Sequence, residues 1–118
     1  MIVIAPKPDL LDASTTRKIA RGRTAIDGRI DLHGMTQVEA HSRLLRYLQT
    51  AYQLGNRTIL VITGKGTRGE GILRQAVPRW LSEPEFRSIA SGFHEANISH
   101  GGSGALYVRI RNPRQGLK

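Results

Sequence analysis

The chain has 118 residues, which is enough for one domain with its own core and too few for two. Its composition, with 39% apolar and 23% charged residues, is typical of a folded globular protein. Cysteine is absent, which excludes disulfides, thiolate zinc sites and thiol catalysis and indicates a reducing, cytoplasmic location. Eighteen Lys and Arg against nine Asp and Glu leave a net charge of +9, so a polyanion is the expected partner.

Residues 1–28 are expected to form a basic N-terminal extension. Pro6 and Pro8 keep its start extended, and the apolar run before them is too short for a signal-peptide core. No stretch is long enough for a membrane span, so no membrane partner is expected. The extension holds a cluster of cations that predicts secondary contacts with nucleic acid, or equally a solvated tail: Arg17, Lys18, Arg21 and Arg23.

The segment that begins at Arg29 predicts a strand followed by a helix. Ile30-Asp-Leu-His33 is a short strand candidate that ends at Gly34. Thr36 and Glu39 have the spacing of a capping box, which marks a helix N-terminus. Gly55 stands where a helix end favours a left-handed residue. Apolar residues recur at helical spacing in between: Val38, Leu44, Leu45, Leu48 and Tyr52.

The remaining pattern predicts a strand, a helix and two final strands. Thr58–Thr63 is a β-branched, apolar run typical of a strand buried on both faces. A glycine-rich loop over 64–71 precedes a helix that runs to Leu81, in which Pro78 predicts a kink or an early end. Residues 86–93 form the third strand candidate. After a second glycine-rich loop, residues 105–110 alternate as a fourth strand.

This order of elements predicts an α/β fold of the βαβαββ type. Right-handed crossovers make the first two strands parallel, and the third as well, whereas the last strand is expected to be antiparallel. We therefore expect an α+β two-layer sandwich, in which a four-stranded mixed sheet carries two helices. The domain is predicted over residues 29–112, with a basic tail at 113–118.

Asp31 and His33 are the first candidates for chemistry. Because they are two residues apart, both side chains point the same way on an extended strand. A carboxylate beside an imidazole suits general acid–base catalysis, although such a histidine also serves as a structural partner or helix cap. Ligands of α/β sheets bind at the carboxyl ends of parallel strands, where this pair would meet the first glycine-rich loop.

The first glycine-rich loop is a candidate anion site built from Gly64, Lys65, Gly66 and Arg68. Its glycines let backbone N–H groups approach a phosphate, and the following helix adds a favourable dipole. The spacing also fits a dinucleotide fingerprint, but the chain lacks room for two mononucleotide halves. A Walker loop is excluded because Gly66 stands where Ser or Thr is required. A nucleic-acid phosphate is favoured over a bound mononucleotide or a turn without a ligand.

The second glycine-rich loop carries His100 and Gly102. His100 is a second proton carrier or phosphate ligand, or equally a surface imidazole. His41 is expected to be packed on its helix, and His94 has no evident role. Histidines and carboxylates show no metal-binding spacing. Aromatic residues are few, so phosphate contacts should dominate over base recognition.

Three sequence blocks together resemble the signature of Smr domains, the module named for small MutS-related proteins: Ile30-Asp-Leu-His-Gly34, Thr63-Gly-Lys-Gly66 and Gly101-Gly-Ser-Gly-Ala105. The resemblance spans residues 29–111. It implies a sandwich similar to the C-terminal domain of a bacterial translation initiation factor, and endonuclease activity on RNA or DNA. It also implies that Asp31 and His33 form the catalytic motif. Many members carry His where Thr63 stands here, although Thr also occurs in the family, so one possible acid–base or phosphate-binding group is absent.

The sequence thus predicts an endonuclease that cleaves RNA, with ribosome-associated messenger RNA as one target, by acid–base catalysis and without a metal. A structure-specific endonuclease that nicks DNA in repair or recombination is one alternative, and it would need Mg²⁺ or Mn²⁺. A non-catalytic module that binds nucleic acid or ribosomes is the other. A monomer is expected in each case.

Overall fold

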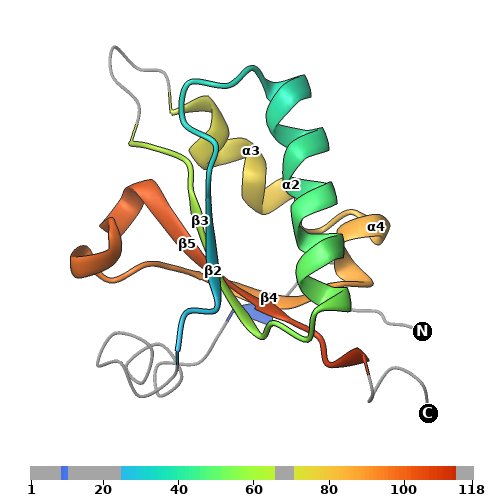
Figure 1. Ribbon diagram of the computed structural model, residues 1–118. Coiled ribbons are helices and arrows are strands. Elements are labelled where there is room, and N and C mark those ends of the chain that lie inside the picture. The colour runs from blue at the N-terminus through green and yellow to red at the C-terminus, as the bar shows by residue number, and fades with distance from the viewer. Residues whose placement is uncertain (1–8, 11–24, 66–70, 114–118) are drawn as a thin grey trace.

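The computed structural model describes residues 9–10, 25–65 and 71–113, in which helices cover one face of a mixed sheet (Figure 1). The elements in chain order are β1 (Asp9–Leu10), β2 (Gly28–Asp31), α2 (Gln37–Gln53), β3 (Thr58–Ile62), α3 (Ile72–Trp80), α4 (Pro84–Arg87), β4 (Ala90–Glu95) and β5 (Ala105–Ile110). The predicted βαβαββ order is therefore confirmed from β2 to β5. The short helix α4 and the two-residue strand β1 were not predicted.

The strands lie in the order β1-β4-β5-β3-β2. β2 pairs with β3 in parallel, whereas β5 is antiparallel to both β3 and β4, as expected for the last strand. β4 runs in the same direction as β3, but β5 lies between them. As a result β2 and β3 end, and β5 begins, at the same end of the sheet. Residues 31–34, 63–65 and 101–104 form this end, which we call the rim.

Helix α2 begins and ends at the predicted signals. The Thr36 side chain accepts the Glu39 N–H, and the Glu39 side chain accepts the Thr36 N–H, which completes the capping box. At the other end Gly55 has a φ of +81° and donates to the Tyr52 carbonyl, as a left-handed C-terminal residue should.

The buried face of α2 differs from the predicted stripe. Its buried residues are Ala40, Leu44, Leu48 and Ala51. Val38 is 81% exposed, because a step of two residues rotates it about 200° from Ala40 around the helix. The predicted stripe was wrong at Val38. The buried side of α2 includes two alanines, Ala40 and Ala51, which the apolar pattern did not include.

The segment from Pro78 to Ala90 also departs from expectation. α3 continues through Pro78 to Trp80, so the helix does not break at the proline. The third strand begins at Ala90 and not at Phe86, which lies in α4 and is fully buried. The β4–β5 register shifts between Ala90 and Gly92, a bulge that glycine accommodates.

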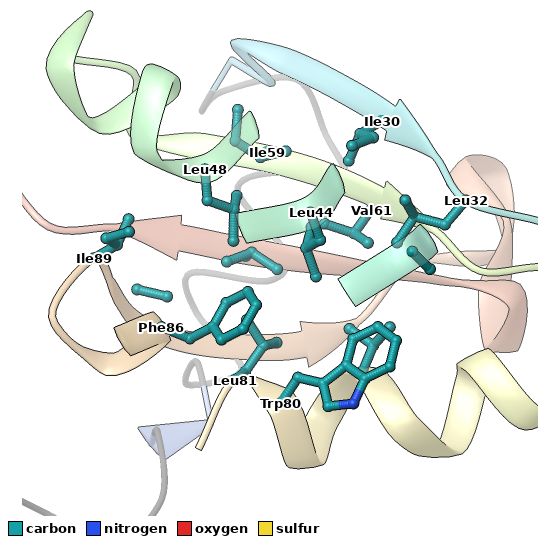
Figure 2. Close-up of a cluster of buried hydrophobic side chains, with 14 of the residues drawn as sticks. Ile30, Leu32, Leu44, Leu48, Ile59, Val61, Trp80, Leu81, Phe86 and Ile89 are labelled. Atoms are coloured by element: carbon teal, nitrogen blue, oxygen red, sulfur yellow. The ribbon is translucent and has the colours of Figure 1, made fainter. Parts of the chain in front are cut away.

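The main core lies between the helices and the sheet, where Leu44 and Leu48 of α2 face side chains of the strands and of α3 and α4 (Figure 2). A smaller cluster on the other face contains Leu60 and Tyr107, so β3 is buried on both faces, as predicted. Ile30 and Leu32 belong to the main core. A one-residue slip of β2 would expose both, at roughly 2 kcal/mol each. Their burial therefore keeps the alternating residues Asp31 and His33 out of the core.

No helix within 25–65 and 71–113 is long and apolar enough to cross a membrane. Six residues with predicted roles lie outside the described residues: Arg17, Lys18, Arg21, Arg23, Gly66 and Arg68. The predicted domain boundaries stay predictions.

Candidate functional site

Asp31 ends β2 and holds the imidazole that follows it. The Nδ1 atom of His33 lies 2.6 Å from Oδ1 of Asp31, and the same oxygen accepts the backbone N–H of His33 at 3.0 Å. An ionised carboxylate can only accept, so Nδ1 carries the hydrogen and Nε2 of the neutral ring keeps its lone pair. The side chains are 69% exposed for His33 and 51% for Asp31. The Nε2 atom is therefore a base accessible to a large substrate.

The hydrogen bond from His33 also changes the acidity of its partner. It lowers the pKa of Asp31 below the ordinary value of 3.8, with smaller contributions from the backbone N–H and the charge of His33. Asp31 is thus a carboxylate throughout the neutral range. Its charge favours a proton on the imidazole during a proton transfer.

The loop after β3 lies directly against this pair. Asp31 is in register with Ile62, and the Leu32 N–H donates to the Ile62 carbonyl at 2.8 Å. Two residues later Gly64 adopts a φ of +80°, and a Cβ atom there would lie 3.2 Å from the Cβ of His33. A side chain at position 64 would therefore be strained and crowded. The expected convergence of the Asp–His pair and the glycine turn is present.

Gly104 joins the second glycine-rich loop to the same turn. Its carbonyl accepts the N–H groups of Thr63 and Gly64 at 2.9 and 3.0 Å. A Cβ atom on Gly104 would lie 3.1 Å from Cγ of Lys65, so glycine lets the loops approach this closely without displacing the lysine side chain. The N–H of Gly64 is thereby occupied and does not point at an anion, contrary to its expected role.

Thr63 is built into this junction. Its side chain is buried at 6% exposure, and its hydroxyl lies 3.1 Å from the Gly64 carbonyl and 3.3 Å from the Gly104 carbonyl. The hydroxyl thus stabilises the turn and is not presented to a substrate. Position 63 therefore offers no exposed polar group at the rim.

Arg74 is a cation at the rim that the sequence analysis missed. It comes from the first turn of α3, and its Nε and Nη2 atoms would lie 3.7 Å from a Cβ on Gly71. The Lys65 carbonyl lies 3.6 Å from the same point. The guanidinium therefore folds back over the end of the glycine-rich loop. The position of Arg74 in the first turn of the helix after the loop was the available signal.

His100 is held by a buried tyrosine. Its Nδ1 lies 2.6 Å from the Tyr107 hydroxyl, which accepts the Asn97 N–H at 3.1 Å. The contact occupies Nδ1 and leaves Nε2 as the ring nitrogen without a partner among the described residues. His33 and His100 thus both use Nδ1 for a contact within the protein, the first with a carboxylate and the second with a hydroxyl.

The remaining candidates lie elsewhere or serve the fold. Gly102 is buried, and its N–H donates to the Asn97 carbonyl at 3.0 Å, so this donor is used within the loop. His41 is packed on α2, as expected, and His94 contacts the Glu95 carbonyl through Nδ1 at 2.8 Å. Across the described ranges, no three His, Asp or Glu side chains cluster as metal ligands.

One known family and several known proteins are similar to this chain. The family described as "Smr domain" matches residues 30–111. The chain is 36% identical over 106 residues to "Ribosome rescue factor SmrB" of Vibrio vulnificus, covering 88% of this chain and 57% of the relative. The protein of the same name from Shewanella putrefaciens is 33% identical over 102 residues, covering 86% and 54%. The chain thus spans about half the length of these relatives.

Two solved structures have the same fold. The Smr domain of Thermus thermophilus MutS2 gives a TM-score of 0.61 at 30% identity, over 71% of this chain and 98% of that one. YdaL, a stand-alone small MutS-related protein from Escherichia coli, gives 0.66 at 29% identity, over 90% and 81%. The predicted mixed sheet with helices is therefore confirmed by comparison as well.

Proposed function

Because this chain belongs to the Smr domain family, we propose that it is an endonuclease that cleaves RNA. The observation that carries the proposal is the Asp31–His33 pair, whose free Nε2 is exposed beside the Gly64–Lys65 turn. A base that is oriented, accessible and next to a cation is the minimum that phosphodiester cleavage needs.

In the proposed reaction, Nε2 of His33 removes the proton of a ribose 2′-hydroxyl. The 2′-oxygen then bonds to the adjacent phosphorus, and the bond from phosphorus to the 5′-oxygen breaks. The leaving oxygen takes a proton from water. The products are a 2′,3′-cyclic phosphate and a 5′-hydroxyl. Asp31 stabilises the imidazolium of His33 through Nδ1–H, and proton transfer of this kind contributes about 10²- to 10⁴-fold in rate.

Two cations are available to the phosphate during this step. Lys65 follows the glycine that contacts His33, and the Arg74 guanidinium lies over the end of the same loop. Both carry positive charge where the transition state accumulates negative charge. An internal nucleophile makes a metal unnecessary for RNA. Cleavage of DNA would require water as the nucleophile and a divalent ion such as Mg²⁺ or Mn²⁺.

We further propose that the substrate is messenger RNA on the ribosome. The relatives are named ribosome rescue factors, and a net charge of +9 favours a partner rich in phosphate. Binding should therefore weaken steeply with salt. The protein would act as a cytoplasmic monomer.

A non-catalytic ribosome-binding module is the second candidate. It is favoured by two features of the rim: the Gly64 N–H is occupied, and Thr63 is buried where many family members have a histidine. Both reduce the number of groups that contact a reacting phosphate. Binding in this case would use the same basic surface without cleavage.

Cleavage of a substrate panel separates the candidates. The panel contains single-stranded RNA, duplex RNA, branched DNA and ribosome-bound messenger RNA, each with and without chelator, followed by analysis of the new ends. We expect cyclic phosphate ends on RNA that persist in chelator. A 3′-hydroxyl with a 5′-phosphate would contradict the metal-free reaction, and cleavage of DNA alone would favour the DNA-nicking alternative.

A double variant and a matched control complete the test. Asp31→Ala/His33→Ala should bind RNA as the parent does and lose cleavage. His94→Ala removes an imidazole from the same face of the sheet and should keep full cleavage, because its Nδ1 contacts a carbonyl of its own strand. A parent protein that binds ribosomes but cleaves nothing in the panel would establish the binding module instead.

A further inference from the structure

One flank of α2 carries a basic hollow outside the rim. The hollow measures about 280 Å³ and is lined by Arg43, Arg46, Tyr47 and Thr50. These positions follow the i, i+3, i+4, i+7 spacing of one helix face. Neither arginine forms an ion pair with any carboxylate of the described residues. Two guanidinium groups and two hydroxyls therefore face one solvent-filled depression with no internal anion.

The hollow borders the outermost strand of the sheet. A Cβ atom on Gly28 would lie 2.5 Å from the Tyr47 hydroxyl, so the glycine lets this tyrosine lie against β2. β2 has only β3 as a neighbour within the described sheet. The opposite flank of α2 is covered, since His41 contacts Trp80 and Glu83 there. The arginines thus lie on the flank of α2 opposite the one that contacts Trp80 and Glu83.

The hollow and the Asp–His pair lie toward opposite ends of the edge strand β2. β2 runs from Gly28, beside Tyr47, to Asp31 at the rim. Three residues of a strand span about 10 Å. Stacked nucleotides rise about 3.4 Å each, so about three nucleotides cover the same distance. Because β2 is the edge strand of the described sheet, an RNA strand held at the rim can reach the hollow around that edge within a few nucleotides.

We propose that this flank of α2 binds the phosphodiester backbone of the RNA strand next to the cleaved bond. Arg43 and Arg46 would contact its phosphates, and the hydroxyls of Tyr47 and Thr50 would donate to phosphate or ribose oxygens. That the ligand is RNA rests on the proposed function. The binding surface itself rests on the hollow, its unpaired charges and its distance from the rim.

The chemistry of the lining favours a polynucleotide over other ligands. A planar guanidinium donates two parallel hydrogen bonds to a phosphate, and two of them one helical turn apart suit successive phosphates. The lining offers one aromatic ring and no aliphatic wall, which is too little apolar surface to enclose a small organic ligand. The surface should thus set affinity and strand direction and carry no base specificity.

RNA binding by single variants tests the surface directly. Arg43→Gln and Arg46→Gln are prepared in the Asp31→Ala/His33→Ala background, so that the RNA stays intact, and the affinity for a single-stranded 20-mer is measured by anisotropy at several salt concentrations. Each variant should reduce the magnitude of the salt slope by about 0.7, and the double variant by about 1.4. We expect the double variant to bind roughly 10-fold more weakly in 0.1 M salt.

The matched control is Arg79→Gln. Arg79 is an exposed arginine of α3, so the substitution changes the net charge by the same amount away from the hollow. It should leave the salt slope nearly unchanged. Equal losses in Arg79→Gln and the α2 variants would overturn the proposal, since only net charge would then matter. Circular dichroism confirms that each variant is folded.

Cleavage kinetics in the otherwise unsubstituted protein provide a second readout. The Arg43→Gln/Arg46→Gln variant should raise KM and leave kcat unchanged, because the hollow lies away from the reacting bond. A fall in kcat at constant KM would contradict the assignment. If the parent protein does not cleave RNA but the α2 variants still lose affinity selectively, the proposed reaction fails and the binding surface stands.

Discussion

The molecule contains two histidine–carboxylate pairs in different surroundings. At the rim, His33 uses Nδ1 to contact Asp31 at 2.6 Å, and the ring is 69% exposed. On α2, His41 uses Nε2 to contact Glu83 at 2.9 Å, and 32% of its side chain is exposed. The His41 ring lies edge-on to Trp80 and Phe86, with centroids 5.0 and 5.2 Å away.

The difference shows that a pair of groups acquires a role from what surrounds it. The first pair leaves Nε2 free and solvent-facing, which permits proton transfer to a large substrate. The second engages Nε2 and packs the ring between aromatic side chains, which holds α2 against the α3–α4 connection. The same two chemical groups thus serve as a candidate catalyst in one place and as a structural link in the other.

The largest expected effect is on catalysis at the rim. His33→Ala should reduce the single-turnover rate of RNA cleavage by about 10²- to 10⁴-fold, because it removes the proposed base. The side chain is mostly exposed, so the free energy of unfolding in urea should change by less than about 0.5 kcal/mol. Cleavage that persists near the parent rate would mean that another group removes the proton.

A smaller loss of cleavage is expected for Asp31→Asn. The substitution preserves shape but removes the charge that stabilises the imidazolium, and it permits the wrong tautomer of His33. Because the pair is exposed and screened by water, we expect a loss of about 10- to 100-fold. Single-turnover kinetics at saturating enzyme measure it. An unchanged rate would show that His33 acts without its carboxylate.

The second pair should respond in stability and not in catalysis. His41→Ala leaves a space between Trp80 and Phe86 and should lower the free energy of unfolding by about 2 kcal/mol, measured in urea. Glu83→Gln keeps a hydrogen-bonding oxygen and should cost less than about 1 kcal/mol. Both variants should cleave RNA at the parent rate well below their unfolding temperature. A selective loss of kcat would place this pair in the reaction.

The smallest effect is the titration of Asp31. Its pKa is lowered in the folded protein, so the stability from its bond to His33 is present above pH 3.8 and is lost as the pH falls through the lowered value. Carboxyl NMR should report a midpoint below 3.8, and His33→Ala should return it toward 3.8. An unchanged midpoint in that variant would contradict the assigned cause.

What sequence reasoning could recover depended on how local each feature is. Asp31 and His33 are two residues apart, so strand periodicity alone places them on one side of β2. The capping box of α2 spans four residues and was equally readable. The link between His41 and Glu83 joins residues 42 apart in the sequence, and no local pattern indicates it.

Several features of the rim could be recognised only in the folded structure, because they join residues that are far apart in the sequence. The closeness of Gly104 to Lys65 depends on β5 lying next to β3, and strand order is not encoded in the periodicity of either strand. The return of Arg74 over Gly71 depends on where α3 begins. The contact of Tyr107 with His100 depends on the smaller hydrophobic cluster, which buries the face of β5 that carries Tyr107.

The position of β5 has a consequence for how the protein is made. β5 is the last of the described strands, yet it pairs with both β3 and β4 in the middle of the sheet. Until residues 105–110 have emerged from the ribosome, β3 and β4 each have an unpaired edge and the hydrophobic core stays exposed. Closure must therefore wait until the end of the domain leaves the ribosome, and interruption of synthesis just before that point would yield a chain prone to aggregate.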